Sequence, residues 1–210
     1  MTDPKITILI RLHAKREELF SVCMQSICMQ SYKNKSVVVA CDGKEAYDLM
    51  QGIVYSNKFD FGLDYFPVVG AIKPDDISDA PYNFYCNQLK AVVKEGWFMF
   101  LDSDDMFASV DSLLKISKHL DMRKYKAVVC QMSRGNGVTK PSIDMLVNKQ
   151  VISGRVGMPC IFTHFSVKDI AHFDGTSNAD FKYIKKLTDS TNSKFVDVVV
   201  VHSPKRRFGK

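Results

Sequence analysis

Three carboxylates follow directly on a run of apolar residues near the middle of the chain. Residues 97–105 read Trp-Phe-Met-Phe-Leu-Asp-Ser-Asp-Asp, so Asp102, Asp104 and Asp105 end a segment typical of a strand buried on both faces. Carboxylates this close repel one another and are costly to bury unless a cation neutralises them. A hard divalent ion, held by one or two carboxylates and by substrate phosphates, is the usual solution. The stretch therefore predicts a metal and a phosphorylated substrate.

The same polar residues also suit a turn before a helix. Asp and Ser side chains accept hydrogen bonds from free backbone N–H groups, and a helix is predicted from Ala108 onward. The buried strand in front of the acids favours the ligand interpretation, because open α/β sheets bind ligands at the carboxyl ends of their strands.

Strand and helix patterns alternate along the chain, which predicts a single-domain α/β sandwich with a mostly parallel central sheet flanked by helices. The expected strands cover residues 6–10, 36–41, part of 59–69, 97–101, 127–132, 159–164 and 195–201. The expected helices cover residues 16–30, 44–54, 82–94, 108–122 and 178–188. The glycine-containing segment 133–157 is predicted to be a loop of the kind that closes over substrates.

Composition excludes several classes of protein. The chain has 210 residues, of which 46% are hydrophobic and 25% charged, as in a globular protein. No window approaches the roughly 18 uninterrupted apolar residues that a membrane span needs, and the N-terminus does not resemble a secretory signal. The six cysteines form no Cys-x-x-Cys pair, so they are interpreted as buried, reduced thiols and not as zinc ligands or disulfides. These features predict a cytoplasmic protein without a transmembrane segment.

The net charge of +6 arises from 29 basic and 23 acidic residues, and part of the excess lies in a basic tail over residues 205–210. Such a tail can mark nucleic-acid or membrane binding, or it can be solvated or lead into further domains beyond residue 210. The second interpretation is favoured, because no array of aromatic and basic residues suited to stacking bases runs along the chain. We therefore expect a domain over residues 1–204 and no nucleic-acid partner.

The order of motifs resembles glycosyltransferases of the GT-A fold, closest to the family-2-like group. A first strand over 6–10 precedes a helix whose end, residues 26–32, reads Ser-Ile-Cys-Met-Gln-Ser-Tyr. Residues 37–43 then read Val-Val-Val-Ala-Cys-Asp-Gly, and Asn87 precedes the Asp-x-Asp motif within 102–105. The resemblance covers nearly the whole chain and implies a Rossmann-like GT-A domain that takes a UDP-sugar as donor.

The resemblance also implies roles for single residues of the donor site. Asp42 matches the acid that contacts the nucleotide base, although Asp-Gly alone would indicate a turn. Asp102 matches the acid near the ribose and metal, and Asp104 matches the one that coordinates Mn²⁺ or Mg²⁺ on the diphosphate. Ser103 and Asn87 are assigned to the nucleotide-sugar site with them.

The loop after the first strand departs from the family pattern. It reads Arg-Leu-His-Ala-Lys-Arg over residues 11–16, where family members often have Pro-x-Tyr-Asn. Arg11 and His13 are assigned to the donor pocket, and Arg16 is a further candidate, because Arg pairs well with phosphate oxygens.

Inverting members of the family need a general base, usually in an acidic pair that opens a helix in the second half of the chain. The matching stretch reads Asn178-Ala179-Asp180, so one acid is replaced and Asp180 is the candidate base, with Asp174 as second choice. An acid in a first helical turn is also explained by the helix dipole alone.

His202 ends the last predicted strand, and several GT-A enzymes complete the metal site with a C-terminal histidine. A neutral imidazole beside carboxylates suits Mn²⁺, while an ordinary hydrogen bond at a strand end explains the residue equally well.

The sequence therefore predicts a metal-dependent, inverting glycosyltransferase that moves one sugar from a UDP-sugar to a hydroxyl of a glycan or glycoprotein. The compact size and basic end further predict a domain cut from a longer viral or bacterial glycan-building enzyme. Two alternatives remain. A sugar nucleotidyltransferase would normally carry a glycine-rich loop after the first strand, and none is present at residues 11–16. A non-catalytic nucleotide- or nucleic-acid-binding module has only the basic tail in its favour.

Overall fold

A computed structural model describes residues 3–13, 17–68 and 80–204. Its strands are β1 (Ile6–Leu12), β2 (Lys35–Asp42), β3 (Gly62–Val68), β4 (Trp97–Asp102), β5 (Met106–Phe107), β6 (Ala127–Arg134), β7 (Thr139–Lys140), β8 (Ile161–His164) and β9 (Ser193–Ser203). Its α-helices are α1 (Glu17–Cys28), α2 (Gly43–Ser56), α3 (Phe84–Ala91), α4 (Ser112–Ser117), α5 (Ile143–Val147) and α6 (Ala179–Ser190). Short 3₁₀ turns are η2 (Pro81–Asn83), η3 (Met158–Cys160) and η4 (Phe165–Val167).

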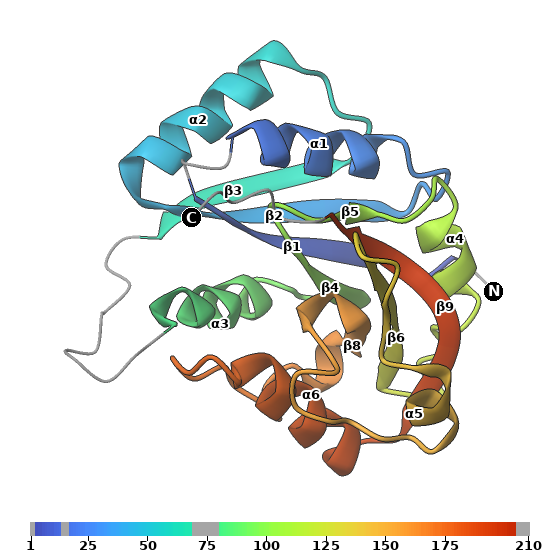
Figure 1. Ribbon diagram of the computed structural model, residues 1–210. Coiled ribbons are helices and arrows are strands. Elements are labelled where there is room, and N and C mark those ends of the chain that lie inside the picture. The colour runs from blue at the N-terminus through green and yellow to red at the C-terminus, as the bar shows by residue number, and fades with distance from the viewer. Residues whose placement is uncertain (1–2, 14–16, 69–79, 205–210) are drawn as a thin grey trace.

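These strands form one mixed sheet in the order β3-β2-β1-β4-β8-β6-β9-β5, with β7 added to β6 (Figure 1). The run β3-β2-β1-β4 is parallel, and β6 is parallel to β9. The strand β8 joins the two parts by antiparallel pairing to both β4 and β6. The predicted α/β architecture with a mostly parallel sheet and flanking helices is confirmed.

Alternating side chains of the central strands pack into two hydrophobic cores, one on each face of the sheet. In β1, Ile8 packs into the core that contains Phe20 of α1, whereas the next residue, Leu9, packs into the core that contains Leu89 of α3. This alternation follows from the two-residue period of a strand. Because both faces are covered, β1 and β4 are almost wholly apolar, and polar residues are left for the strand ends.

Two predictions about local structure are wrong. The helix expected over residues 108–122 is the shorter α4, and Met106 and Phe107 in front of it form β5 by pairing with β9. The loop expected over 133–157 contains β7 and the short helix α5. Met106 and Phe107 pair with a strand that is distant in sequence, which local patterns cannot show. The strand β7 instead forms a hairpin with the neighbouring β6.

The other expected helices and strands are present, with ends shifted by a few residues. Five of the six cysteines are buried, but Cys28 at the end of α1 is exposed, which corrects the expectation for that residue. Within the described ranges, no helix is long and apolar enough to cross a membrane. Arg16 and the basic tail lie outside the described residues.

Candidate active site

Three of the predicted site residues stand at the carboxyl ends of neighbouring parallel strands. Arg11 lies near the end of β1, Asp42 ends β2 and Asp102 ends β4. Arg11 and Asp102 are register partners across the two strands, and their side chains form an ion pair between Nη2 and Oδ1. The expectation that the acids lie at the carboxyl edge of the sheet is confirmed, as for ligand sites in other open α/β sheets.

Arg11 connects the acidic strand end to the second half of the chain. Its Nη1 donates to Oδ1 of Asn83 at 2.9 Å, and Nδ2 of Asn83 donates to the carbonyl of Thr176 at 2.9 Å. The guanidinium lies 5.2 Å from the ring centroid of Tyr82, within cation–π range. Because the guanidinium is already engaged with Asp102, its predicted contact with a substrate phosphate stays a prediction.

Asp42 is held by a neighbouring tyrosine. The hydroxyl of Tyr85, on α3, donates to Asp42 Oδ1 at 2.6 Å, and burial together with this hydrogen bond raises the pKa of Tyr85 so that it remains a donor. His13 Nε2 lies 3.6 Å from the other oxygen, Oδ2. The side chains of Asp42 and His13 are 36% and 52% exposed, so this carboxylate is oriented yet accessible to a ligand.

The turn over residues 102–105, called the acidic turn below, places most of its side chains inside the protein. The backbone N–H of Asp105 donates to the carbonyl of Asp102 at 2.9 Å, which closes the turn. Ser103, Asp104 and Asp105 are all buried, whereas Asp102 keeps 28% of its side-chain exposure. Burial of adjacent acids requires a neutralising neighbour.

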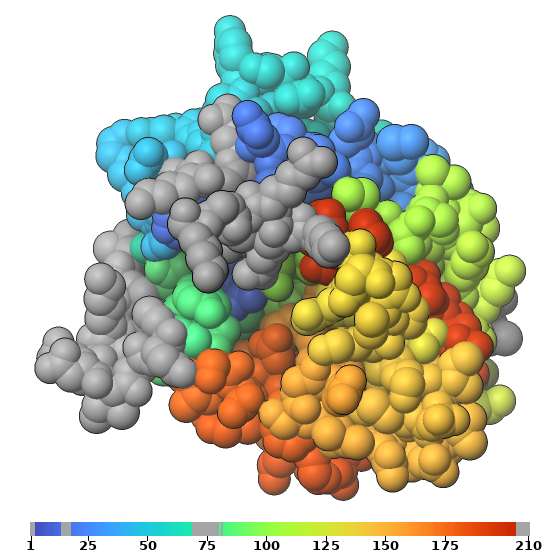
Figure 2. Space-filling model, in the orientation of Figure 1, coloured from blue at the N-terminus to red at the C-terminus, as the bar shows by residue number. Residues whose placement is uncertain are grey.

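The chain after this turn pairs with the strand that carries His202. In β5, Met106 pairs with His202 of β9 in antiparallel register. Nδ1 of His202 and Oγ of Ser133 are 2.9 Å apart, so Nε2 is the ring nitrogen left to bind an ion. Figure 2 shows the end of β9, in red, at the surface beside the yellow segment that follows β6.

The candidate metal ligands suit an ion whose coordination is completed by oxygen atoms of a substrate. Among the described residues, no group of three or more His, Cys, Asp or Glu side chains is arranged to hold a metal. Asp104 and His202 supply one carboxylate and one imidazole near the strand end, and Mn²⁺ or Mg²⁺ commonly takes few protein ligands together with phosphates and water. The residues therefore fit a metal that binds together with a diphosphate.

Asp180 has the environment of a general base. It lies in the first turn of α6, and the backbone N–H of Met158 donates to its Oδ2 at 3.3 Å. Burial, followed by the charge of Asp102, raises its pKa to about 6, although the charge of Arg11 acts in the opposite direction. A carboxylate with a pKa near the working pH can take up a proton from a hydroxyl and release it again.

Asp174, the second candidate, has a different environment. Lys182 Nζ donates to its Oδ2 at 2.6 Å, and both the backbone N–H and the hydroxyl of Thr176 donate to its Oδ1. Burial raises the pKa of Asp174, but these hydrogen bonds outweigh that effect and hold it below its usual value. The geometry therefore favours Asp180 over Asp174 as a proton acceptor.

Replacement of Arg11 should change the pH at which Asp180 titrates. The Arg11 charge lowers the pKa of Asp180, so Arg11→Gln is expected to raise it above 6 by roughly one unit. The charge of Arg11 favours the ionised carboxylate, so without it the pH midpoint of Asp180 ionisation should move to higher pH. An NMR titration of the Asp180 carboxyl group from pH 4 to 9 in both proteins checks this, and an unchanged or lower midpoint in the variant would contradict it.

Asn87 is turned toward the backbone. Its Nδ2 donates to the carbonyl of Phe173 at 2.8 Å, and its Oδ1 accepts from the N–H of the same residue at 2.9 Å. Both hydrogen bonds tie α3 to the segment that leads into α6. The predicted contact between Asn87 and the nucleotide stays a prediction, while a positioning role follows directly from these contacts.

We expect Asn87→Asp to destabilise the protein by about 1–3 kcal/mol. The isosteric carboxylate cannot donate, so the Phe173 carbonyl loses its partner and meets a negative charge. Gln88→Glu, on the adjacent exposed residue, introduces the same charge and is the matched control. Urea unfolding of both variants measures the difference, and equal stabilities would show that the paired hydrogen bonds contribute nothing.

Sequence reasoning missed three residues that organise the site. Tyr82, Asn83 and Tyr85 all come from the start of the third helical segment and reach Arg11 or Asp42. Their spacing carries no motif. The only available signal was a polar and aromatic start to a helix that follows an acid-rich stretch.

Comparisons with known proteins identify the fold. No protein-family model matches the chain, and no curated protein matches it. S. aureus TarS 1-349 in complex with UDP-GlcNAc is 18% identical, with a TM-score of 0.70 over 98% of this chain and 60% of that one. The mannosyltransferase PcManGT from Pyrobaculum calidifontis, in complex with GDP-Man and Mn²⁺, is 15% identical, with a TM-score of 0.69 over 99% of this chain and 59% of that one.

The chain therefore has the GT-A fold of these glycosyltransferases and spans about 60% of their length. Identities this low show the fold and do not transfer an activity. A viral origin finds no support in these two structures and stays a prediction.

Proposed function

We propose that this protein is a metal-dependent glycosyltransferase that moves one sugar from a nucleoside diphosphate sugar to an acceptor hydroxyl. The observation that carries the proposal is the grouping of Asp42, the acidic turn after β4 and Asp180 around one edge of the sheet, with the pKa of Asp180 raised to about 6. The solved structures of the same fold were obtained with UDP-GlcNAc and with GDP-Man and Mn²⁺.

In the proposed donor site, Asp42 receives the base. Its Oδ1 is held by Tyr85, and Oδ2 is the oxygen available to accept a hydrogen bond from a ring N–H. Uracil and guanine both carry such a group, and we propose UDP-sugar as the donor. Asp102, with Ser103 beside it, lies at the adjacent strand end, where the ribose would sit.

In the proposed chemistry, Asp180 takes the proton of the acceptor hydroxyl. That oxygen then attacks the anomeric carbon of the donor from the face opposite the nucleotide, which inverts the configuration as the diphosphate leaves. When bound at Asp104 and His202, Mn²⁺ or Mg²⁺ would neutralise charge on the departing diphosphate. Arg11 holds Asp102 in place and keeps Asp180 more acidic than it would otherwise be.

We propose a glycan or glycoprotein acceptor, a cytoplasmic location and no nucleic-acid partner. Further domains beyond residue 210 are compatible with the share of the related structures that this chain covers. We also propose that residues 1–204 form one domain and that residues 205–210 are a basic tail or linker.

Calorimetric titration with UDP, and separately with GDP, each with and without Mn²⁺, tests the function. Metal-dependent binding of UDP, stronger than that of GDP, is the expected result. Incubation with labelled UDP-sugars and a glycan library would then identify donor and acceptor. If neither nucleotide binds under any metal condition, the acids form only a turn and the proposal fails.

Titrations with other ligands separate the two alternatives. A sugar nucleotidyltransferase would bind UTP together with a sugar phosphate and release pyrophosphate. A nucleic-acid-binding module would bind DNA or RNA with an affinity that falls steeply with salt. Either result without binding of a UDP-sugar would replace the present proposal.

A further inference from the structure

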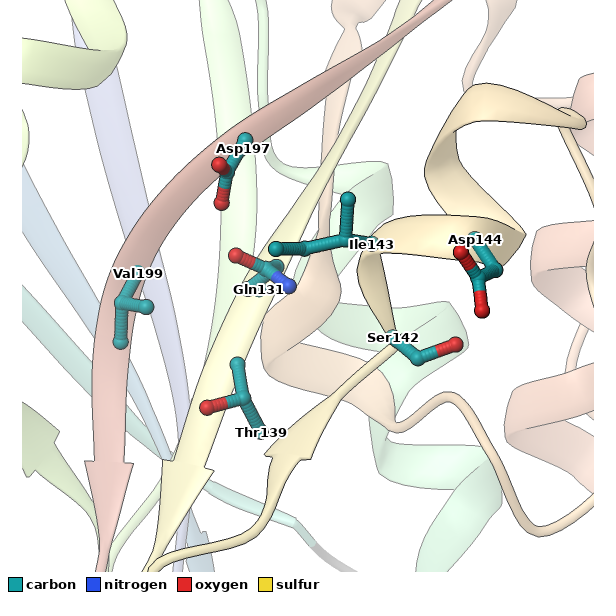
Figure 3. Close-up of a pocket in the computed structure, with 7 residues that line it drawn as sticks. All are labelled: Gln131, Thr139, Ser142, Ile143, Asp144, Asp197 and Val199. Carbon is teal, nitrogen blue, oxygen red and sulfur yellow. The ribbon is translucent and has the colours of Figure 1, made fainter.

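A pocket of about 400 Å³ opens beside the candidate active site, on the other half of the sheet. Its walls come from β6, β7, β9 and the start of α5 (Figure 3). The lining residues are Gln131, Thr139, Ser142, Ile143, Asp144, Asp197 and Val199. Small-molecule sites commonly measure roughly 300–1,000 Å³, so this volume suits a ligand of about one sugar ring.

The pocket lies next to Ser133, the residue whose hydroxyl contacts His202. Side chains two residues apart on a strand share a face, so Gln131 and Ser133 of β6 point to the same side of the sheet. Ser133 pairs with Thr139 of β7 and contacts His202 through its hydroxyl. Gln131 is therefore about 7 Å along the strand from the residue that supports the proposed metal ligand.

Gln131 presents a buried polar group to this pocket. The residue is only 2% exposed, and its Nε2 donates to the carbonyl of Pro141 at 2.8 Å. That bond fixes the amide plane and leaves Oε1 as the acceptor atom, which Figure 3 shows on the side of Asp197. A buried carbonyl oxygen facing a pocket favours a ligand that donates a hydrogen bond.

The other lining groups define the chemistry of that ligand. Asp197 adds a carboxylate and Thr139 a hydroxyl that can donate or accept. Asp144 adds a second carboxylate at the rim, with its side chain on the other side of the start of α5 (Figure 3). The aliphatic side chain of Ile143, which is 58% exposed, offers a surface for C–H groups. No lysine or arginine is among the residues that line the pocket, so an anionic ligand would meet only like charge.

We propose that this pocket binds a neutral or amino-bearing sugar ring of the acceptor, and that it excludes acceptors with a carboxylate or phosphate at that ring. The inference rests on the proposed glycosyltransferase function and specifies its acceptor side. The hydroxyls and any ammonium group of the sugar donate to Gln131 and Asp197, while its apolar face lies on Ile143 (Figure 3). The next sugar along the glycan would extend toward Ser133 and His202.

The test uses three monosaccharides that share a ring and differ in charge: glucosamine, glucose and glucuronate. Each is titrated into protein with ¹³C-labelled isoleucine methyl groups, and the NMR signal of Ile143 reports binding. We expect saturable shifts with glucosamine and glucose, and at least tenfold weaker binding of glucuronate, a difference of about 1.4 kcal/mol. Equal or tighter binding of glucuronate would overturn the proposal.

Two conservative variants sharpen the result. Asp197 is exposed, so Asp197→Asn should fold normally, and it should reduce the preference for glucosamine over glucuronate about tenfold. Asp48→Asn, on α2 and outside the pocket, removes one charge of the same kind and should leave the preference unchanged. An unchanged preference in Asp197→Asn would also overturn the proposal.

Titration of the same sample with UDP and Mn²⁺ separates the two inferences. Binding of UDP without any sugar-dependent shift at Ile143 would overturn the pocket assignment and leave the proposed function standing. Sugar-dependent shifts without binding of any nucleotide would support a sugar site in this pocket and overturn the glycosyltransferase function.

Discussion

Asp180→Asn is expected to lower the rate of sugar transfer by about 10²–10⁴-fold and to leave nucleotide binding almost unchanged. The amide keeps the shape of the side chain but cannot take up the proton of the acceptor hydroxyl. In the wild-type protein, burial and the charge of Asp102 raise the pKa of Asp180 to about 6. Transfer by the wild type should therefore be lost as pH falls through about 6 and level off above it, whereas the residual rate of the variant should not follow this titration.

Asp174→Asn is the matched control for this experiment, because it changes the second acid of the same region in the same way. Its carboxylate is already held by Lys182 and Thr176, so only a small change in rate is expected. Transfer is followed as nucleotide release from the donor that calorimetry identifies, in the presence and absence of acceptor. Loss of transfer in Asp174→Asn with normal transfer in Asp180→Asn would exchange the two roles.

Asp104→Asn is expected to weaken the Mn²⁺-dependent binding of UDP by roughly a hundredfold, or about 2.7 kcal/mol. Asp104 is the acid placed in the turn between β4 and β5, and loss of a carboxylate ligand removes most of the attraction for the ion and the diphosphate. Without the metal, wild type and variant should bind UDP equally weakly. Calorimetry with and without Mn²⁺ measures the affinity for UDP under each condition.

Asp105→Asn serves as the control, because Asp104 and Asp105 are buried to nearly the same extent, at 6% and 5% exposure. Thermal unfolding shows whether either variant has lost its fold. If Asp105→Asn removes the metal dependence and Asp104→Asn retains it, Asp105 is the ligand. If both variants bind UDP as the wild type does, the acids serve only the turn.

Much of the parallel half of the sheet could be predicted because its signals are local. The apolar runs of β1, β2 and β4 each bury side chains on both faces, and each ends in a charged or polar residue. Parallel strands bring their carboxyl ends to one edge, so the position of Asp42 and Asp102 at the same edge could be expected from the pattern, whereas the ion pair between Arg11 and Asp102 could not. The start of α6 next to Asp180 was also visible as a helical period behind a polar segment.

The antiparallel half was harder to predict, because strands of two residues have no periodicity of their own. Met106 and Phe107 form β5 only because β9 lies alongside them. In the same way, Thr139 and Lys140 form β7 only because they pair with β6. The backbone N–H of Ala108, at the start of the expected helix, also donates to the carbonyl of Val200 in β9, and α4 begins only at Ser112. Propensity gave no indication, since tertiary context outweighs it in such short segments.

The sequence by itself determined the class of fold and the acidic edge of the sheet, because strand period, helix period and turn chemistry are set by neighbouring residues. The choice of Asp180 as candidate base came from the resemblance to family-2-like glycosyltransferases and stays a prediction. Only the tertiary structure decided which side chains meet. Tyr85 reaches Asp42, and Ser133 reaches His202, across contacts between residues far apart in the chain. It also decided the pKa of Asp180, because burial and the charges of Asp102 and Arg11 arise only when three separate segments fold together.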